Sequence, residues 1–499
     1  MRSGNEFEIV TKLRLPFLKS AGEEMMDKNK RVEQTSKSFG SPSQKNYNEI
    51  IEFLDNNWDH TRAGKDLTTI KKLDQALGSP SKDLDTILVS GTNGKSLTIH
   101  FTTKLLREDG LNVGAFMTPH ILTYNERFSL NNEIISNKAF TDIANEVLSA
   151  AEANNISADT LELLTAMALL YFRKNNVDVA LLEMSNRHAY DPISICKANV
   201  IGVSRITDDQ IPASESTTLD QIVNYTLHAI QPGTHVVSAD QSKHNLQVIQ
   251  NAATERGGSW AMPIRKLAQL TYPYEQLHGR CAALAERLAQ LYMDDYSKKN
   301  SVVASNSLLI KEKGQRGRPT LEAKRQSELN PKRTLEQFWQ ETINTLPGRF
   351  QVLDKEKPSL LLDNASNTDA LKNLLLGVRL LHYQRPLKGL TFIFGCDKNK
   401  LNTEEFLKLL RYFTKKNSGQ IIFCPIEPNL SGVSEESWDV EKVTNAVKGL
   451  KVKARSAANF EQAFDFAKKT VDERHGLVVI TGSQSILMQY WKQKGMKKL

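Results

Sequence analysis

One short stretch, Ile87 to Thr98, constrains this chain more than any other part of its sequence. An apolar run typical of a buried strand ends at Ser90, two glycines enclose a Thr-Asn pair, and a lysine and a serine open a segment with helical periodicity. Glycine allows a tight turn whose backbone N–H groups face an anion, and the following helix presents its positive end there. A hydroxyl directly after the lysine is placed to bind the Mg²⁺ that accompanies ATP. The order therefore predicts a nucleotide-phosphate loop formed by Gly91, Thr92, Asn93, Gly94, Lys95 and Ser96.

The spacing of this loop differs from the common Gly-x-x-x-x-Gly-Lys-Ser pattern, because Val89 stands at the position of the first glycine. The alternative interpretation is a strand-to-helix turn that only requires small residues. The combination of strand, turn and helix favours nucleotide binding over that alternative.

Length and composition limit the number of domains and the classes of partner that we expect. With 499 residues and 40% hydrophobic content, the chain exceeds the roughly 250–300 residues at which one core stops growing, so we expect two domains. The net charge of +8 is a small excess of 65 basic over 57 acidic residues, which argues against a nucleic-acid partner. The four cysteines show no Cys-x-x-Cys pairing, and no apolar run could span a membrane. We therefore expect a cytoplasmic monomer without a membrane span.

Strand patterns alternate with helix patterns in two parts of the chain. Residues 46–296 are expected to form the larger domain and residues 336–499 the smaller one, while residues 1–45 read as a disordered extension. Residues 297–335 are basic and polar, which indicates a linker or insertion, with an anion-binding arm as the alternative. The alternation predicts an α/β fold, with a P-loop-type, doubly wound parallel sheet followed by a smaller C-terminal α/β domain. Ligands gather at the carboxyl ends of such strands, where three predicted segments fall: Gly91–Ser96, Thr118–His120 and Glu183.

A series of short motifs occurs along the chain in a fixed order. They are Gly91-Thr92-Asn93-Gly94-Lys95, Gly114-Ala115-Phe116-Met117-Thr118-Pro119-His120, Tyr124-Asn125-Glu126-Arg127, Gln231-Pro232-Gly233, Leu346-Pro347-Gly348-Arg349, Asp363-Asn364-Ala365-Ser366-Asn367 and Thr481-Gly482-Ser483. Together they resemble the Mur ligase superfamily and, within it, the folylpolyglutamate synthetases, including bifunctional dihydrofolate synthases. The resemblance covers roughly residues 46–296 and 345–495. It implies an ATP-binding domain joined to a smaller ligase domain, with substrates in the cleft between them.

The resemblance also implies a reaction, the ATP-dependent formation of an amide between a folate and L-glutamate. The γ-phosphoryl group is transferred to the folate carboxylate, and the glutamate amine attacks the acyl phosphate. Such chemistry depends on neutralising charge around the phosphates. By position, Lys95 and the amides of residues 92–96 would hold phosphates, and the folate would lie along residues 118–127. The remaining implied roles are Mg²⁺ ligation by Ser96, Thr118, Glu183 and Gln210, ATP and amino-acid binding by Arg349 and Asp363, and proton transfer by His120.

Four departures from the family pattern stand out. Residues 185–189 replace a glycine-rich segment, Gln210 replaces a metal-binding histidine, Thr226 replaces a lysine that is carbamylated in many members, and Ser366 replaces a histidine. An amide oxygen binds Mg²⁺ weakly, and threonine forms no carbamate. The first alternative is therefore a catalytically weakened relative that binds a nucleotide or a partner protein. The second is a Mur-type ligase for another acid, which is supported only by Lys95-Ser96, because folate members usually carry an extra glycine between these two residues.

Structural interpretations also remain open for three single residues. Glu183 could be a solvated residue at a strand end, and His120 could be a packed loop histidine. Arg349 could form a salt bridge at a domain edge.

Overall fold

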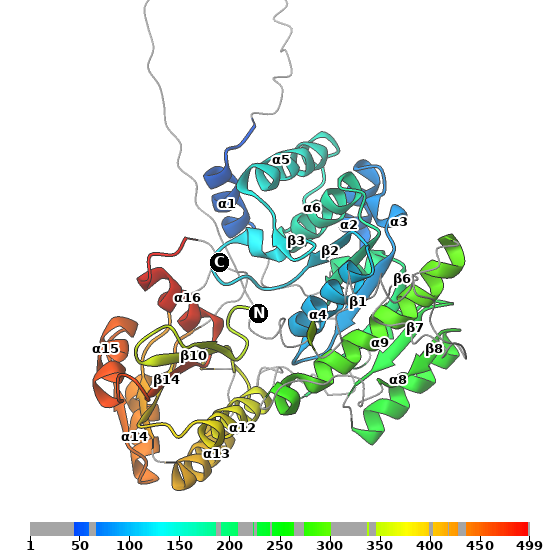
Figure 1. Ribbon diagram of the computed structural model, residues 1–499. Coiled ribbons are helices and arrows are strands. Elements are labelled where there is room, and N and C mark those ends of the chain that lie inside the picture. The colour runs from blue at the N-terminus through cyan, green and yellow to red at the C-terminus, as the bar shows by residue number, and fades with distance from the viewer. Residues whose placement is uncertain are drawn as a thin grey trace, which may run out of the picture. The chain divides into compact units, whose positions relative to one another are not determined.

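The computed structural model of the chain describes residues 44–58, 66–185, 191–207, 223, 227–239, 242–263, 274–300, 337–338, 346–398, 403–417, 419–427 and 436–497 (Figure 1). Several predictions lie outside these residues. They concern the N-terminal extension up to residue 43, the linker beyond residue 300, and the positions of Gln210 and Thr226.

The first sheet has the strand order β4-β3-β2-β5-β1-β6-β7-β8. Its parallel part confirms the predicted doubly wound arrangement, because β1 lies between β5 and β6 and pairs with both in parallel. Two short strands that the sequence analysis did not predict, β3 and β4, extend one edge in antiparallel pairing. The strands are β1 Thr86–Ser90, β2 Val113–Phe116, β3 Phe128–Leu130, β4 Glu133–Ile134, β5 Val179–Glu183, β6 Ala198–Val203, β7 His235–Ser238 and β8 Ser259–Ala261.

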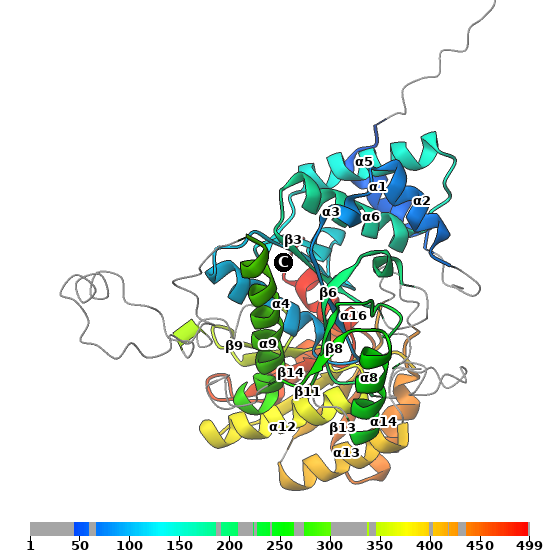
Figure 2. The same cartoon turned by 90° about the vertical axis from the view of Figure 1, so that its right-hand side faces the viewer.

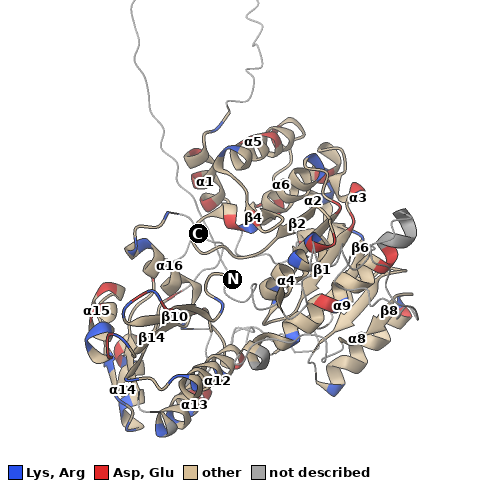
Figure 3. Ribbon diagram, in the orientation of Figure 1, with Lys and Arg blue, Asp and Glu red and all other residues tan. Residues whose placement is uncertain are grey.

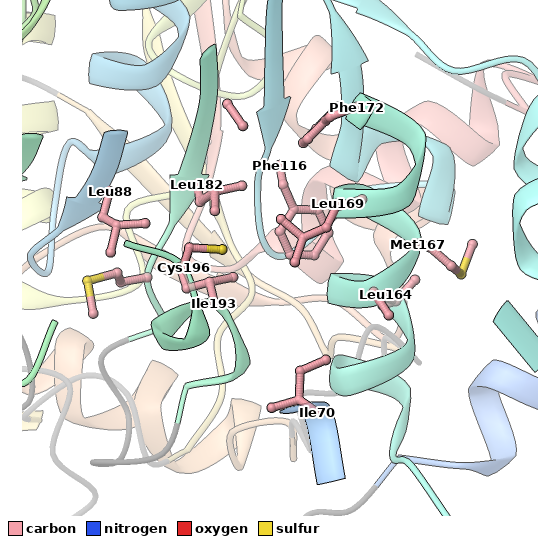
Figure 4. Packing of buried hydrophobic residues seen from close by; sticks show 14 of the residues in the cluster. Ile70, Leu88, Phe116, Leu164, Met167, Leu169, Phe172, Leu182, Ile193 and Cys196 are labelled. Atoms are coloured by element: carbon pink, nitrogen blue, oxygen red, sulfur yellow. The ribbon is translucent and has the colours of Figure 1, made fainter. Parts of the chain in front are cut away.

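Both faces of this sheet are buried, since Leu88 of β1 contributes to one hydrophobic cluster and its neighbours Ile87 and Val89 contribute to another. The Leu88 side of the sheet packs against helix α6, as Phe116 and Phe172 illustrate in Figure 4. On the opposite side α4 and α9 lie side by side (Figures 1 and 2). The helices of this part are α1 Tyr47–Asn56, α2 Thr68–Ala76, α3 Pro80–Asp83, α4 Lys95–Glu108, α5 Asn137–Ala153, α6 Thr160–Lys174, α8 Lys243–Glu255 and α9 Tyr274–Asn300, with short 3-10 turns at Tyr124–Arg127 and Pro192–Ile195.

The second sheet has the order β13-β12-β11-β14-β10-β9, parallel except for the antiparallel edge strand β9. Its strands are β9 Gln351–Leu353, β10 Ser359–Asp363, β11 Leu390–Phe394, β12 Gln420–Phe423, β13 Ala454–Ser456 and β14 Leu477–Thr481. Its helices are α12 Thr368–Gln384, α13 Thr403–Lys416, α14 Val440–Gly449, α15 Phe460–Thr470 and α16 Gln484–Gln493. Two helices, α15 and α16, bury one face, and α12, α13 and α14 bury the other. The predicted α/β fold class with a second α/β sheet is confirmed.

Charged side chains of both signs are spread over the outer helices of the described part (Figure 3). This mixture agrees with the small excess of positive charge in the composition. The charged side chains are spread over a solvated surface and are not gathered on a single basic face. Within the described ranges, no helix combines the length and the apolar character needed to cross a membrane.

Candidate active site

The phosphate loop follows β1 and ends where α4 begins. Gly91 and Gly94 have φ angles of 120° and 95°, in the region that favours glycine. Added Cβ atoms would lie 2.1 Å from Ser204 Oγ and 2.8 Å from Cys281 Sγ, respectively. Backbone conformation and packing therefore both require glycine at these positions. The loop residue Gly94 is the N-cap of α4 and supplies no capping side chain, as suits a helix start that receives an anion.

Two backbone amides of the loop are not oriented as the sequence analysis expected. The N–H groups of Thr92 and Asn93 donate hydrogen bonds to the carbonyl oxygen of Arg205, at 2.6 and 3.2 Å. The prediction that all the amides of residues 92–96 face a phosphate is thus corrected. The start of α4, at Lys95 and Ser96, remains the part of the loop suited to an anion.

Four predicted site residues meet at the carboxyl ends of the strands. The ammonium of Lys95 donates to the carbonyl oxygen of Gly91 at 2.8 Å and lies 3.7 Å from Glu183 Oε1. The hydroxyl of Ser96 donates to Glu183 Oε2 at 3.0 Å, and the backbone N–H of Thr118 donates to the same oxygen at 3.4 Å. This cluster lies beside β1, where the chain order reverses and where ligands bind in open α/β sheets.

Glu183 is the central acid of this cluster. Its side chain is only 4% exposed, so the interpretation as a solvated residue at a strand end does not hold. Burial raises the pKa of the Glu183 carboxyl, while Lys95, Arg349 and the Ser96 hydroxyl act in the opposite direction. A buried carboxylate beside a hydroxyl offers the oxygen ligands that Mg²⁺ prefers. Among the described residues no three His, Cys, Asp or Glu side chains gather as a metal site, so a bound ion would complete its shell with nucleotide oxygens and water.

The second domain contributes Arg349 and Asp363. Phe350, which follows Arg349, has a φ of 47°, and its N–H donates to Asp363 Oδ2 at 2.7 Å. Burial raises the pKa of Asp363 to about 6, against the opposing effects of this hydrogen bond and of the Arg349 charge. Since the Arg349 charge also lowers the pKa of Glu183, the guanidinium acts on acids of both domains.

His120 lies in a packed loop. The residue is 6% exposed, and its Nδ1 accepts a hydrogen bond from Arg127 Nε at 2.8 Å. Burial, assisted by the Arg127 charge, holds the pKa of His120 well below its ordinary value. An imidazole that is neutral and already bonded is poorly suited to take a proton from a substrate amine. The structure favours the packed-loop interpretation over the predicted role in proton transfer.

Glu126 organises the same loop and was not singled out as a site residue. Its carboxylate accepts hydrogen bonds from the backbone N–H groups of Ile121, Leu122 and Thr123, at 2.7, 2.8 and 2.7 Å. The only sequence signal for this arrangement is the capping-box spacing of Thr123 and Glu126, which the structure contains. The carboxylate fixes the path of the chain from Thr118, beside Glu183, to Arg127.

Replacing Glu126 with glutamine is expected to lower the melting temperature by roughly 2–5 °C. The new NH₂ group would face one of the buried N–H donors, and a buried donor without an acceptor costs about 1–3 kcal/mol. The matched control is Glu133→Gln on the exposed strand β4, which should leave the melting temperature unchanged. Equal melting temperatures for the two variants in a thermal scan would contradict the role of Glu126 in holding the backbone of residues 121–123.

The family model "Mur ligase, glutamate ligase domain" matches residues 348–484 of this chain. Among curated proteins, the chain is 28% identical over 225 residues to "Dihydrofolate synthase/folylpolyglutamate synthase" of Bacillus subtilis, covering 44% of this chain and 49% of that protein. The match thus spans about half the length of that relative. "Probable folylpolyglutamate synthase" of Saccharomyces cerevisiae is 25% identical over 395 residues, with 74% and 84% covered.

Among solved structures, the fold is similar to that of the bifunctional folylpolyglutamate synthase/dihydrofolate synthase from Yersinia pestis complexed with AMPPNP and Mn ion. The TM-score is 0.67 at 20% identity, and the match covers 91% of this chain and 98% of that one. At this identity the likeness establishes the fold.

Proposed function

We propose that the chain is an ATP-dependent ligase that joins L-glutamate to a folate, because it is similar to folylpolyglutamate synthases and its residues 348–484 match the model of the Mur ligase glutamate-ligase domain. The observation that supports this most is the buried Glu183 with Lys95, Ser96 and the Arg349 charge around it. A reaction through an acyl phosphate needs positive charge around the transferred phosphoryl group more than it needs a nucleophilic side chain. The cluster supplies that charge together with a carboxylate.

In this proposal the residues hold and orient the reactants. Lys95 moves from the Gly91 carbonyl and Glu183 to the phosphates, and the start of α4 binds the same anion. The oxygen ligands offered by Ser96, Thr118 and Glu183 would hold Mg²⁺, which supplies charge neutralisation on the phosphate oxygens. From the second domain, Arg349 stabilises the phosphoryl group, and Asp363 acts at the ATP and glutamate side of the site.

The proposal is tested with purified protein, ATP, Mg²⁺, labelled L-glutamate and tetrahydrofolate monoglutamate. Labelled glutamate should enter the folate with one ADP released for each amide formed. Nucleotide binding without incorporation would support the binding-protein alternative, and incorporation only into another carboxylic acid would support a different Mur-type ligase. Either result would overturn the folate assignment.

The raised pKa of Asp363 predicts that the stability of the folded protein depends on pH. Its pKa is raised in the folded state from 3.8 to about 6, so between these values the unfolded chain releases a proton that the folded chain keeps. Stability from this group is therefore full below pH 3.8 and is lost as the pH rises to about 6. The variant Asp363→Asn should gain in melting temperature over the wild type across this window, by roughly 2–5 °C. Thermal scans from pH 4 to pH 8 check this, and a constant difference at all pH values would contradict it.

A further inference from the structure

The side chain of Asn93, in the middle of the phosphate loop, is bonded to the second domain. Its Nδ2 donates to Asn367 Oδ1 at 3.2 Å and to Asp369 Oδ2 at 2.9 Å. In return, Asn367 Nδ2 donates to Asn93 Oδ1 at 2.9 Å. Both partners lie at the start of α12, and they are 4% and 8% exposed, respectively. The Asn93 side chain, which lies between the two glycines of the loop, therefore bonds the loop to helix α12 of the second domain.

Arg205, just after β6, closes this arrangement into a ring. Its carbonyl oxygen accepts the N–H groups of Thr92 and Asn93, and its Nε lies 2.8 Å from Asp369 Oδ1. The two carboxylate oxygens of Asp369 thus interact with different residues, Oδ1 with Arg205 and Oδ2 with Asn93. The loop backbone is therefore bonded to Arg205 and the Asn93 side chain to Asp369, while Arg205 and Asp369 contact each other.

The ring is also connected, through the chain segment after β10, to the proposed site residues Asp363 and Arg349. Asp363 ends β10, and Asn367 follows it as the N-cap of α12, with its Oδ1 also accepting the N–H of Ala370 at 2.9 Å. A contact at Asn367 and Asp369 therefore fixes the chain segment that carries Asp363, whose carboxylate in turn fixes the backbone next to Arg349. Small displacements of positioned groups cost large factors in rate.

We propose that Asn93, Arg205, Asn367 and Asp369 form an interdomain latch, which sets the position of Arg349 and Asp363 relative to Lys95. In this proposal their side chains act as positioning groups. The inference rests on the proposed ligase function for its kinetic consequence, but the contact itself can be tested without turnover. The residues Asn367 and Asp369 are both buried, and this burial explains why the latch is specific, since displaced partners would leave their polar groups buried without hydrogen bonds.

The kinetic test uses Asn367→Ser and a matched control, Asn459→Ser. Serine retains the ability to cap a helix but is too short to reach Asn93. The control changes the N-cap of α15, whose side chain accepts the N–H of Gln462 at 2.9 Å and makes no interdomain bond among the contacts described here. We expect kcat to fall about 10-fold or more in Asn367→Ser while the Kd for ADP stays within about threefold, because phosphate binding belongs to Lys95 and the start of α4. The control should keep its kcat.

A second pair of variants tests Arg205. The variant Arg205→Lys keeps a cation and the carbonyl, and it should retain most of the kcat that Arg205→Ala loses. An equal loss in both, or wild-type kcat in Asn367→Ser and Asp369→Ala, would overturn the latch while leaving the ligase function intact.

Hydrogen exchange provides the readout that does not depend on turnover. In Asp369→Ala the amides of Thr92 and Asn93 should exchange several-fold faster than in the wild type, because the ring that holds Arg205 against them is open. The amides of β14, in the interior of the second sheet, serve as the internal reference. Unchanged exchange at Thr92 and Asn93 would overturn the latch even if the wild-type protein showed no folate ligation at all.

Discussion

Replacing Lys95 with alanine is expected to reduce kcat/KM for ATP by about 1,000-fold or more, which corresponds to about 4 kcal/mol of lost transition-state stabilisation. In the structure the Lys95 ammonium has two carbonyl partners, of Gly91 and Thr92, and the Glu183 carboxylate 3.7 Å away. Alanine removes the one full positive charge that the phosphate loop itself carries. Because the site is buried, that charge acts through a low effective dielectric on the developing phosphoryl charge.

The matched control for Lys95→Ala is Lys104→Ala, farther along the same helix α4. Calorimetric titration with ATP should show affinity weaker by roughly 10–100-fold for Lys95→Ala and unchanged for the control. If Lys95→Ala bound ATP as tightly as the wild type, the assignment of the loop as a phosphate site would be wrong.

The sequence predicted those parts of the site that depend on local chain geometry. The phosphate loop needs glycine at positive φ directly after a buried strand, and both requirements are visible in residues 87–95. The convergence of Ser96, Thr118 and Glu183 follows from topology, because parallel strands bring their carboxyl ends to one edge of the sheet. The positions of β1, β2 and β5 were therefore enough to predict that meeting.

Other features depend on pairs of residues far apart in the chain and leave no local pattern. The acceptor for the loop amides is the carbonyl oxygen of Arg205, a backbone atom that any residue would supply. The partner of Asn93 is Asn367, more than 270 positions later, and either amide alone reads as an ordinary turn or cap residue. Edge strands such as β3 and β4 are too short for an alternating pattern to identify them.

Replacing Glu183 with glutamine is expected to reduce kcat by about 100-fold or more, without loss of stability. Glutamine keeps the size of the side chain and an oxygen that can accept from Ser96, but it removes the negative charge that would bind Mg²⁺. Since burial raises the pKa of Glu183, the ionised carboxylate lowers the stability of the folded state above the pKa of the unfolded chain. The variant should therefore melt at the same or a higher temperature at pH 8, and its advantage should shrink as the pH falls towards about 4.

The control for Glu183→Gln is Glu162→Gln, a buried glutamate of the same domain. The carboxylate of Glu162 accepts the N–H of Asp159 at 2.9 Å in the capping box of α6, a role that glutamine also fills. This variant should keep its kcat. Opposite signs for rate and stability in Glu183→Gln would show that the buried charge is retained for the site and not for the fold, which is a recurrent trade-off in active sites. If instead both kcat and melting temperature fell together, the acid would be structural, and Mg²⁺ would have to be bound elsewhere.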